Sequence, residues 1–258
     1  MKSYKTVFIS DVHLGTKMSQ AENLLDFFKT FECEKMYLVG DIIDGWAMNR
    51  SKYWPQTHND VIQKLLRRAR KGTEIIYIPG NHDEFMRDFC DFEFGHIILA
   101  RESIHVGIDS KLYLITHGDQ FDAVISHAKW LSKVGSWAYD VSIVINRYLN
   151  KIRKLLGMPY WSLSSYLKQT VKESVNFIGD YETTLSNYVK SKKLDGIICG
   201  HIHHVKISDI GGIRYMNCGD WVESCTALVE HHDGSFEIID WKKNERNNFS
   251  STDVKIVE

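Results

Sequence analysis

The stretch Val39-Gly40-Asp41-Ile42-Ile43-Asp44 places a glycine and two carboxylates directly after a short apolar run, residues 36–39. Such a run predicts a buried β-strand. Four more apolar runs end in polar residues in the same way. These ends are Asp11-Val12-His13, Gly80-Asn81-His82-Asp83, His117-Gly118-Asp119 and Gly200-His201-Ile202-His203. Because open α/β sheets bind ligands beyond the carboxyl ends of their strands, we expect the five segments to converge on one site.

Composition is typical of a soluble globular protein. The chain has 258 residues, 25% charged and 43% hydrophobic, which is enough for one large domain with a substantial core. Its formal net charge of -1 gives no general case for nucleic-acid binding. We find no signal-peptide pattern and no apolar run near the roughly 20 residues of a membrane span. The five cysteines form no C-x-x-C pair, so we expect a reduced, cytoplasmic compartment.

Strands and helices alternate along the first part of the chain. The pattern predicts strands at 4–10, 36–39 and 74–78 and helices at 19–31 and 57–71. Ser19 is placed to cap the first helix, and Glu22 would complete a capping box. Such alternation is typical of βαβ units in a parallel sheet.

The later part of the chain predicts antiparallel hairpins instead. Three pairs of apolar runs flank short polar turns, at 104–108 and 112–115, at 205–210 and 213–216, and at 226–231 and 235–241. Together the two halves indicate an α/β (α+β) fold with a mixed, two-layer β core covered by helices. From about Asn244 the chain is polar, and we expect it to be frayed.

Residues 126–178 differ from both halves. They predict nearly all helix, with no strand that ends in donor residues. Eight basic and two acidic residues give this segment a charge of +6. We therefore expect a single domain, residues 1–258, that carries an inserted helical cap at about 126–178.

The donor residues predict a metal site. Asp11 and His13 lie two apart, so in an extended backbone they would face the same way, and His201 and His203 repeat that spacing. Seven side chains are candidate ligands: Asp11, His13, Asp41, Asn81, His117, His201 and His203. Seven oxygen and nitrogen donors suit two ions that share a bridge, and the absence of thiolates favours Mn, Fe or Zn. Two ions about 3.5–4 Å apart bind a phosphoryl group and activate water.

Each motif has a simpler explanation when it stands alone. An Asp-x-His after a strand is a weak signal, Gly-Asn-His-Asp is also a turn sequence, and a His-x-His can be a surface pair. Five such elements in one chain, each after an apolar strand, favour metal binding over these alternatives.

With these motifs the chain resembles the calcineurin-like metallophosphoesterase superfamily over residues 11–203. The resemblance implies a two-sheet β-sandwich flanked by helices. It implies that Asp11, His13, Asp41 and His203 hold one ion. It also implies that Asp41, Asn81, His117 and His201 hold the other, with Asp41 as the bridge. The catalytic residues would be Asp41, His82 near the leaving-group oxygen, and Asp44 behind that imidazole.

Two further stretches narrow the resemblance. Residues 117–122 and 217–224, with the cap between the fourth and fifth motifs, look like those of UDP-2,3-diacylglucosamine hydrolases. Those enzymes cleave the pyrophosphate of a nucleotide-linked lipid into UMP and a lipid phosphate. His82 departs from the best-known branch, which has arginine there. A phosphoesterase for soluble nucleotides and a binding scaffold with decayed metal sites are the alternatives, and the intact ligands argue against the scaffold.

Other aromatic and polar residues are candidate substrate contacts: Trp46, Asp122, His127 and Trp161. His204 would point away from His203 in a regular strand. We expect the remaining histidines to be ordinary surface or core residues, namely His58, His96, His105, His231 and His232.

The predicted cap also has features of a segment that binds a membrane surface. Apolar residues recur along 130–156 at steps of three and four, beside Lys151, Arg153 and Lys154. One interpretation is a helix packed on the β core with a solvated basic face. The other is an acyl-chain groove at an anionic membrane surface, which would make the protein peripheral at the inner face of the membrane.

Overall fold

The computed structural model describes residues 1–121, 179 and 181–243. The chain divides into two compact units, Met1–Asp119 with Ser186–Glu258, and Gln120–Leu185. The expected cap and the expected frayed C-terminus lie outside the described residues, so both stay predictions. The first unit contains all the strands of the described part.

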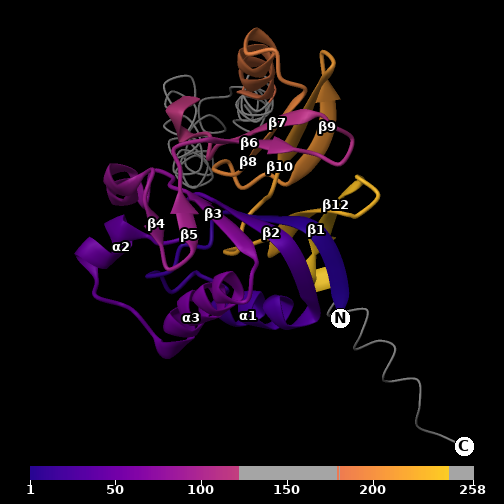
Figure 1. The fold of residues 1–258 in the computed structure, drawn as a ribbon. Helices are drawn as coiled ribbons and strands as arrows, with labels where there is room; N and C mark the ends of the chain where they lie inside the picture. The colour runs from indigo at the N-terminus through magenta and orange to yellow at the C-terminus, as the bar shows by residue number, and fades with distance from the viewer. Residues whose placement is uncertain (122–178, 180, 244–258) are drawn as a thin grey trace, which may run out of the picture. The chain divides into compact units, whose positions relative to one another are not determined.

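A seven-stranded mixed sheet forms the first layer (Figure 1), in the order β12-β11-β1-β2-β3-β5-β4. Its strands are β1 (Lys2–Ile9), β2 (Phe31–Val39), β3 (Glu74–Ile78), β4 (Glu93–Phe94), β5 (Ile97–Leu99), β11 (Thr226–Glu230) and β12 (Phe236–Asp240). β1, β2, β3 and β5 are parallel neighbours, as the βαβ pattern predicts. β11 and β12 form the last expected hairpin and pair antiparallel beside β1.

A five-stranded sheet forms the second layer, in the order β6-β7-β8-β10-β9. Its strands are β6 (Ser103–Val106), β7 (Leu112–Ile115), β8 (Gly196–Cys199), β9 (Lys206–Ile210) and β10 (Ile213–Asn217). The β6–β7 and β9–β10 pairs are the other two expected hairpins, which are confirmed. β8 runs parallel to both β7 and β10, so the two sheets together give the expected α/β fold.

Alternation along the strands separates two hydrophobic layers. In β1, Phe8 packs into a core with Tyr113 of β7 and Met216 of β10, which belong to the second sheet. Its neighbours Val7 and Ile9 point to the opposite face and pack in the core that includes the helices. Successive side chains of a strand point to opposite faces, so a strand covered on both faces contributes alternate residues to two cores. The donor residues therefore emerge from strand ends that are fixed on both sides.

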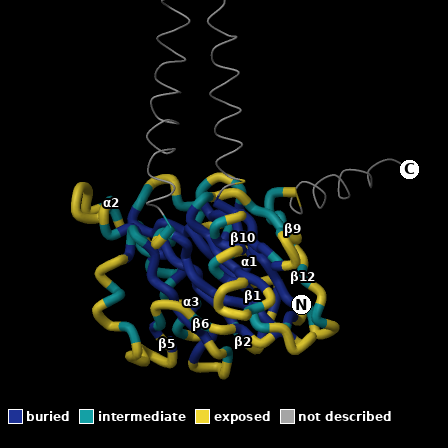
Figure 2. Tube along the Cα trace, turned by 90° about the horizontal axis from the view of Figure 1, so that it is seen from above, coloured by how far each residue is buried: buried dark blue, intermediate teal, exposed yellow. Residues whose placement is uncertain are grey.

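Helices α1 (Ala21–Thr30) and α3 (Gln56–Arg70) lie side by side against the seven-stranded sheet (Figure 1). A short helix, α2 (Gly45–Arg50), has no buried residue and is exposed in Figure 2, whereas the tube in the middle of that view is dark blue. Two 3₁₀ helices, η1 (Glu84–Phe89) and η2 (Asp119–Phe121), follow strand ends. None of the helices in the described part has the length and apolarity that crossing a bilayer requires.

The expected start of the first helix is wrong. α1 has Gln20 as its N-cap, and no side chain caps it. The hydroxyl of Ser19 is buried without a hydrogen-bond partner, so Ser19 and Glu22 form no capping box. The backbone amide of Gln20 instead donates to the carbonyl of Trp221 at 2.8 Å. This long-range contact, which a local pattern cannot contain, sets where the helix begins.

Candidate metal centre

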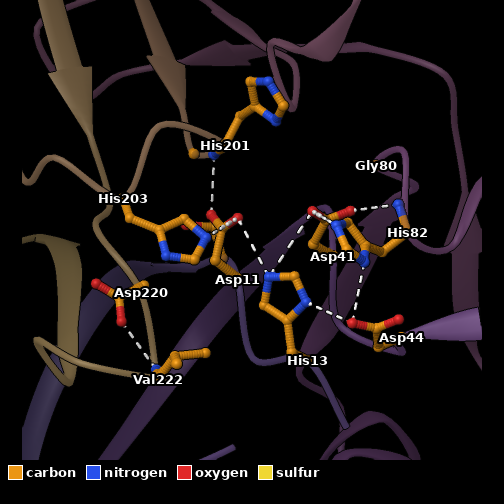
Figure 3. A network of polar contacts seen from close by, with 12 residues as sticks. Asp11, His13, Asp41, Asp44, Gly80, His82, His201, His203, Asp220 and Val222 are labelled. Carbon is orange, nitrogen blue, oxygen red and sulfur yellow. Dashed lines mark hydrogen bonds and ion pairs between the residues drawn. The ribbon is translucent and has the colours of Figure 1, made fainter. Parts of the chain in front are cut away.

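The five motifs follow the carboxyl ends of β1, β2, β3, β7 and β8, and Figure 3 shows residues of four of them close together: Asp11, Asp41, His82 and His201. Asp11 and Asp41 follow the two central parallel strands of the large sheet. His117 follows β7, and His201 and His203 follow β8, in the small sheet. The donor segments therefore converge as the strand pattern predicts, and they come from both sheets.

The backbone at the donors is left-handed, so the assumption of an extended chain is wrong. The φ angles are 53° at Asp11, 52° at His13, 53° at Asp41, 69° at His201 and 50° at His203. The amides of Asp11 and His13 donate to the carbonyls of Gly40 and Asp41 at 3.0 and 2.9 Å, which turns the chain beyond β1. Strand alternation therefore says nothing about His204, whose side chain is exposed.

Among the described residues, three groups of side chains bring their donor atoms within 4.8 Å of one another. The groups are Asp11, His13 and His203; Asp41, His117 and His201; and His13, Asp41 and His82. Oδ2 of Asp41 lies 3.9 Å from Nε2 of His13 and 3.3 Å from Nε2 of His117. Asp41 therefore lies between the first two groups, where a bridging ligand would have to be.

Backbone contacts hold these donors in position. Nδ1 of His117 donates to the carbonyl of Val39 at 2.9 Å, so Nε2 is the nitrogen that faces Asp41. The amide of His82 donates to Oδ1 of Asp41 at 2.8 Å, and the amide of His201 donates to Oδ2 of Asp11 at 2.9 Å. Such contacts fix tautomers and orientations in metal sites.

Glycines let these side chains pack closely. A Cβ at Gly40 would lie 2.2 Å from Nδ1 of His117, and a Cβ at Gly80 would lie 2.3 Å from Oδ1 of Asp41. Gly40 also has a φ of +78°, which glycine adopts without strain. The two glycines are therefore required by the space that the donors occupy.

Buried polar atoms without partners show that the site fits a cation. Nε2 of His13, Nε2 of His117 and Oδ1 of Asn81 are buried and accept or donate no hydrogen bond within the described part. Leaving such atoms unpaired is costly. All three belong to the predicted ligand set, and oxygen and imidazole donors suit hard or borderline divalent ions.

Comparison with known proteins agrees with this geometry. A family model described as calcineurin-like phosphoesterase matches residues 4–205. The chain belongs to the calcineurin-like phosphoesterase family. It is therefore a metal-dependent phosphoester hydrolase, and its site serves divalent metal ions.

Relatives of this phosphoesterase include UDP-2,3-diacylglucosamine hydrolases. The one from Porphyromonas gingivalis is 24% identical over 249 residues, covering 84% of this chain and 90% of the relative. The one from Wigglesworthia glossinidia brevipalpis is 26% identical over 238 residues, covering 86% and 89%. A phosphoesterase from E. coli of known structure aligns with a TM-score of 0.43 at 15% identity, covering 91% of this chain and 98% of that one.

Charges in this phosphoesterase site balance one another. Burial alone would raise the pKa of Asp41, but the neighbouring His117 holds it well below its ordinary value. Burial alone would lower the pKa of His117, and the carboxylates of Asp41 and Asp11 raise it to about 10. A metal ion must displace the proton on His117, so we expect metal affinity to rise with pH.

His82 and Trp46 flank the donor groups. Nδ1 of His82 lies 2.9 Å from Oδ2 of Asp44, and its Nε2 lies 4.0 Å from Oδ2 of Asp41. Burial lowers the pKa of His82, but Asp44 and Asp41 outweigh it and raise that pKa above its ordinary value. Trp46, exposed by 43%, packs on the imidazole with 4.3 Å between ring centroids.

Asp83 is a buried residue of the site whose role the sequence does not indicate. Its Oδ2 accepts hydrogen bonds from the amide of Ile42 at 2.8 Å and from the hydroxyl of Tyr77. Its Oδ1 accepts one from the amide of Gly80. Asp83 therefore ties the loop after β2 to the loop after β3. The sequence signal that could have indicated this role is the position of Asp83 three residues after Gly80, a spacing that is common in turns.

The remaining candidates divide into two sets. Three predicted substrate contacts, Asp122, His127 and Trp161, lie outside the described residues. His58 is buried and accepts a hydrogen bond from the amide of Gly15 at 2.9 Å. His105 is buried against Glu230 at 2.8 Å. His96, His231 and His232 lie at the surface beside carboxylates, within 3.2 Å of Glu93, 2.9 Å of Glu237 and 3.7 Å of Glu34 respectively.

Proposed function

We propose that this phosphoesterase hydrolyses the pyrophosphate bond of a UDP-linked 2,3-diacylglucosamine, releasing UMP and a lipid phosphate. The observation that carries hydrolysis is the position of Asp41 between two donor groups, with His82 beside it. The lipid substrate is supported by the relatives, whose similarity extends over most of both chains.

The metal ligands are part of this proposal. Asp11, His13, Asp41 and His203 would hold one divalent ion, and Asp41, Asn81, His117 and His201 a second. We propose Mn²⁺ for both, with Fe or Zn as the alternatives that the same donors accept. When bound, such ions polarise phosphoryl oxygens and lower the pKa of water.

The chain's own groups act on the leaving oxygen. In hydrolysis, a water oxygen bonds to one phosphorus while the bond from that phosphorus to the bridging oxygen breaks. The bridging oxygen departs with the other phosphate and needs a proton or a hydrogen bond. His82, whose pKa is raised by Asp44, is placed to supply it from Nε2. Trp46 beside this imidazole gives an aromatic face to the departing group.

One observation favours a second candidate, hydrolysis of a soluble nucleotide. Position 82 is histidine, whereas the best-known branch of diacylglucosamine hydrolases has arginine there. An arginine binds a substrate phosphate through two parallel hydrogen bonds, which an imidazole cannot do.

Purified protein loaded with Mn²⁺ tests the two candidates. It should release UMP from UDP-2,3-diacylglucosamine in detergent faster than it hydrolyses UDP-glucose or bis-p-nitrophenyl phosphate. Reaction in H₂¹⁸O, with mass analysis of both products, shows which phosphorus takes the water oxygen. Turnover of soluble nucleotides without UMP release from the lipid would replace the first candidate by the second.

A further inference from the structure

A polar pocket lies far from the metal centre. It has a volume of ≈ 430 Å³ and lies between the C-terminal end of α3, the end of α1 and the start of β2. β2 has nine residues from Phe31, at the pocket, to Val39, next to the donors. At about 3.3 Å per residue, this separates the pocket from the metal centre by roughly 25 Å.

Four cations line this pocket: Lys64, Arg67, Arg68 and Lys71. No carboxylate in residues 1–121, 179 and 181–243 forms an ion pair with any of the four. Two acids also line it, Glu32 and Glu34, and Glu34 is already paired with Lys5 at 2.5 Å. The pocket therefore keeps an excess of positive charge.

Arg68 is a fixed part of the pocket wall. The residue is buried, with 8% of its surface exposed. One terminal nitrogen, Nη2, donates to the carbonyls of Phe28 and Phe31 at 2.7 and 2.8 Å. The guanidinium lies 4.5 Å above the ring of Phe31. Its Nε is buried without a hydrogen-bond partner in the described part, which leaves one donor unused in a pocket wall.

The helix dipole explains only some of these cations. Basic residues at the C-terminal end of a helix are stabilised by about 0.3–1 kcal/mol each, which accounts for Arg67, Arg68 and Arg70 in the last turn and for Lys71 at the C-cap. Lys64 lies more than a turn earlier. Its pKa is lowered by burial and then by the charges of Arg68, Arg67 and Lys71. The cluster therefore repels itself, and an anion would relieve that repulsion.

We infer that this pocket binds a soluble, phosphate-bearing small molecule of nucleotide or sugar-phosphate size. Ligand pockets typically have volumes of about 300–1,000 Å³, and this one falls within that range. Lys64, Arg67 and Lys71 would contact the phosphate groups, with Arg68 behind them. The site is separate from the hydrolytic centre and does not depend on the substrate proposed above.

Calorimetric titration of the metal-loaded enzyme with methylenediphosphonate, which has no P–O–P bond to cleave, tests this inference. The wild type should show a binding component that the Lys64→Gln/Arg67→Gln/Lys71→Gln variant weakens by roughly 100-fold, as expected for lost charge-assisted contacts. Arg70→Gln is the matched control, because Arg70 lies in the same last turn outside the pocket lining.

Hydrogen exchange gives a measurement that does not depend on the variants. The diphosphonate should protect amides of residues 31–34 and 71–73 in the wild type. Equal titrations for all three proteins, without protection there, would overturn the inference. A second result would also overturn it: the wild type binds phosphatidylglycerol vesicles but not the diphosphonate, and the triple variant loses the vesicle binding. The ligand would then be a membrane surface.

Discussion

Oδ2 of Asp44 lies 2.9 Å from Nδ1 of His82, and the same oxygen accepts a hydrogen bond from Nδ1 of His13 at 3.1 Å. The other oxygen of Asp44 accepts a hydrogen bond from the amide of Ala47 at 2.6 Å and caps α2. One carboxylate therefore orients both a predicted ligand and the imidazole that we propose acts on the leaving group. Both rings consequently present Nε2 to the site.

The His82→Ala variant should keep its metal content and lose rate. For a leaving group that needs a proton, we expect a loss of about 10²–10⁴-fold. p-Nitrophenolate, which leaves without protonation, should suffer much less. Asp44→Asn should instead lower metal content as well, because it also releases His13. Steady-state rates on both substrates, beside metal analysis, measure this, and an equal loss on both for His82→Ala would contradict a leaving-group role.

Replacing Asp41 by asparagine should remove most bound metal and nearly all hydrolysis. The change keeps the side-chain shape but removes the charge that lies between the two donor groups. Metal analysis after dialysis and hydrolysis of bis-p-nitrophenyl phosphate measure both effects. Asp26→Asn, an exposed carboxylate paired with Lys29, is the control. Full activity of Asp41→Asn with two equivalents of metal would exclude the bridging role.

Gly40→Ala should abolish metal binding, because the added Cβ meets His117 at 2.2 Å. Gly212→Ala is a matched control: its φ is +83°, close to the +78° of Gly40, and a Cβ there meets nothing within 4 Å. Both changes carry the left-handed strain of about 1–2 kcal/mol. Metal titration and urea unfolding separate the effects, and similar behaviour of the two variants would mean that strain alone matters.

Glu230 should make stability depend on acid pH. It is fully buried and accepts hydrogen bonds from Thr6, His105 and the amide of Ile108 at 2.9, 2.8 and 3.0 Å. Burial raises the pKa of Glu230, but the bonds from His105 and Ile108 outweigh this and hold it below its ordinary 4.5. Its contribution is therefore complete above pH 4.5 and is lost as pH falls through the lowered value.

Glu230→Gln should lower the free energy of unfolding by about 1–3 kcal/mol at neutral pH, because its amide group faces donors. The difference from wild type should shrink in acid, where the wild-type carboxylate becomes protonated. Urea unfolding midpoints of both proteins measure this difference between about pH 3 and 7, a range that covers the titration of carboxyl groups. Glu237→Gln on the exposed face of β12 is the control. A difference that stays constant with pH would contradict the assignment.

The basic residues of the predicted cap test the membrane interpretation. Charge reversal of Lys151, Arg153 and Lys154 should weaken binding to anionic liposomes, since each adds about 1 kcal/mol near such a surface. It should also slow hydrolysis of the lipid-linked substrate and spare bis-p-nitrophenyl phosphate. Sedimentation with liposomes at low salt measures the binding. If the protein does not bind liposomes and the charge reversal affects both substrates equally, the cap would act only as a lid.

The strand pattern predicted the position of the site because each donor segment directly follows an apolar run. β3, β7 and β8 begin and end within a residue or two of the expected runs. β2 is longer than expected and begins at Phe31, because the polar residues of its first half alternate in exposure instead of forming an apolar run. A window that searches for apolar residues cannot find such a half-exposed strand start.

Contacts between distant segments are what the sequence could not supply. The turn at Asp11 and His13 depends on carbonyls of the loop after β2, and the roles of Asp83 and Tyr77 depend on the same loop. The basic pocket likewise requires Arg68 of α3 to reach the carbonyl of Phe28 at the end of α1. Periodicity describes faces of single elements, whereas these contacts depend on how the elements pack.

The left-handed backbone at the metal centre restricts which ligand chemistry evolution can use there. Asp, Asn and His are the non-glycine residues that tolerate positive φ best, and they are also metal donors. The five left-handed donors are all aspartate or histidine, although glutamate and cysteine bind metals as well. Installing thiolates to shift this centre toward a softer metal would therefore add backbone strain at these five positions, whereas exchange among aspartate, asparagine and histidine respects the backbone that is already present.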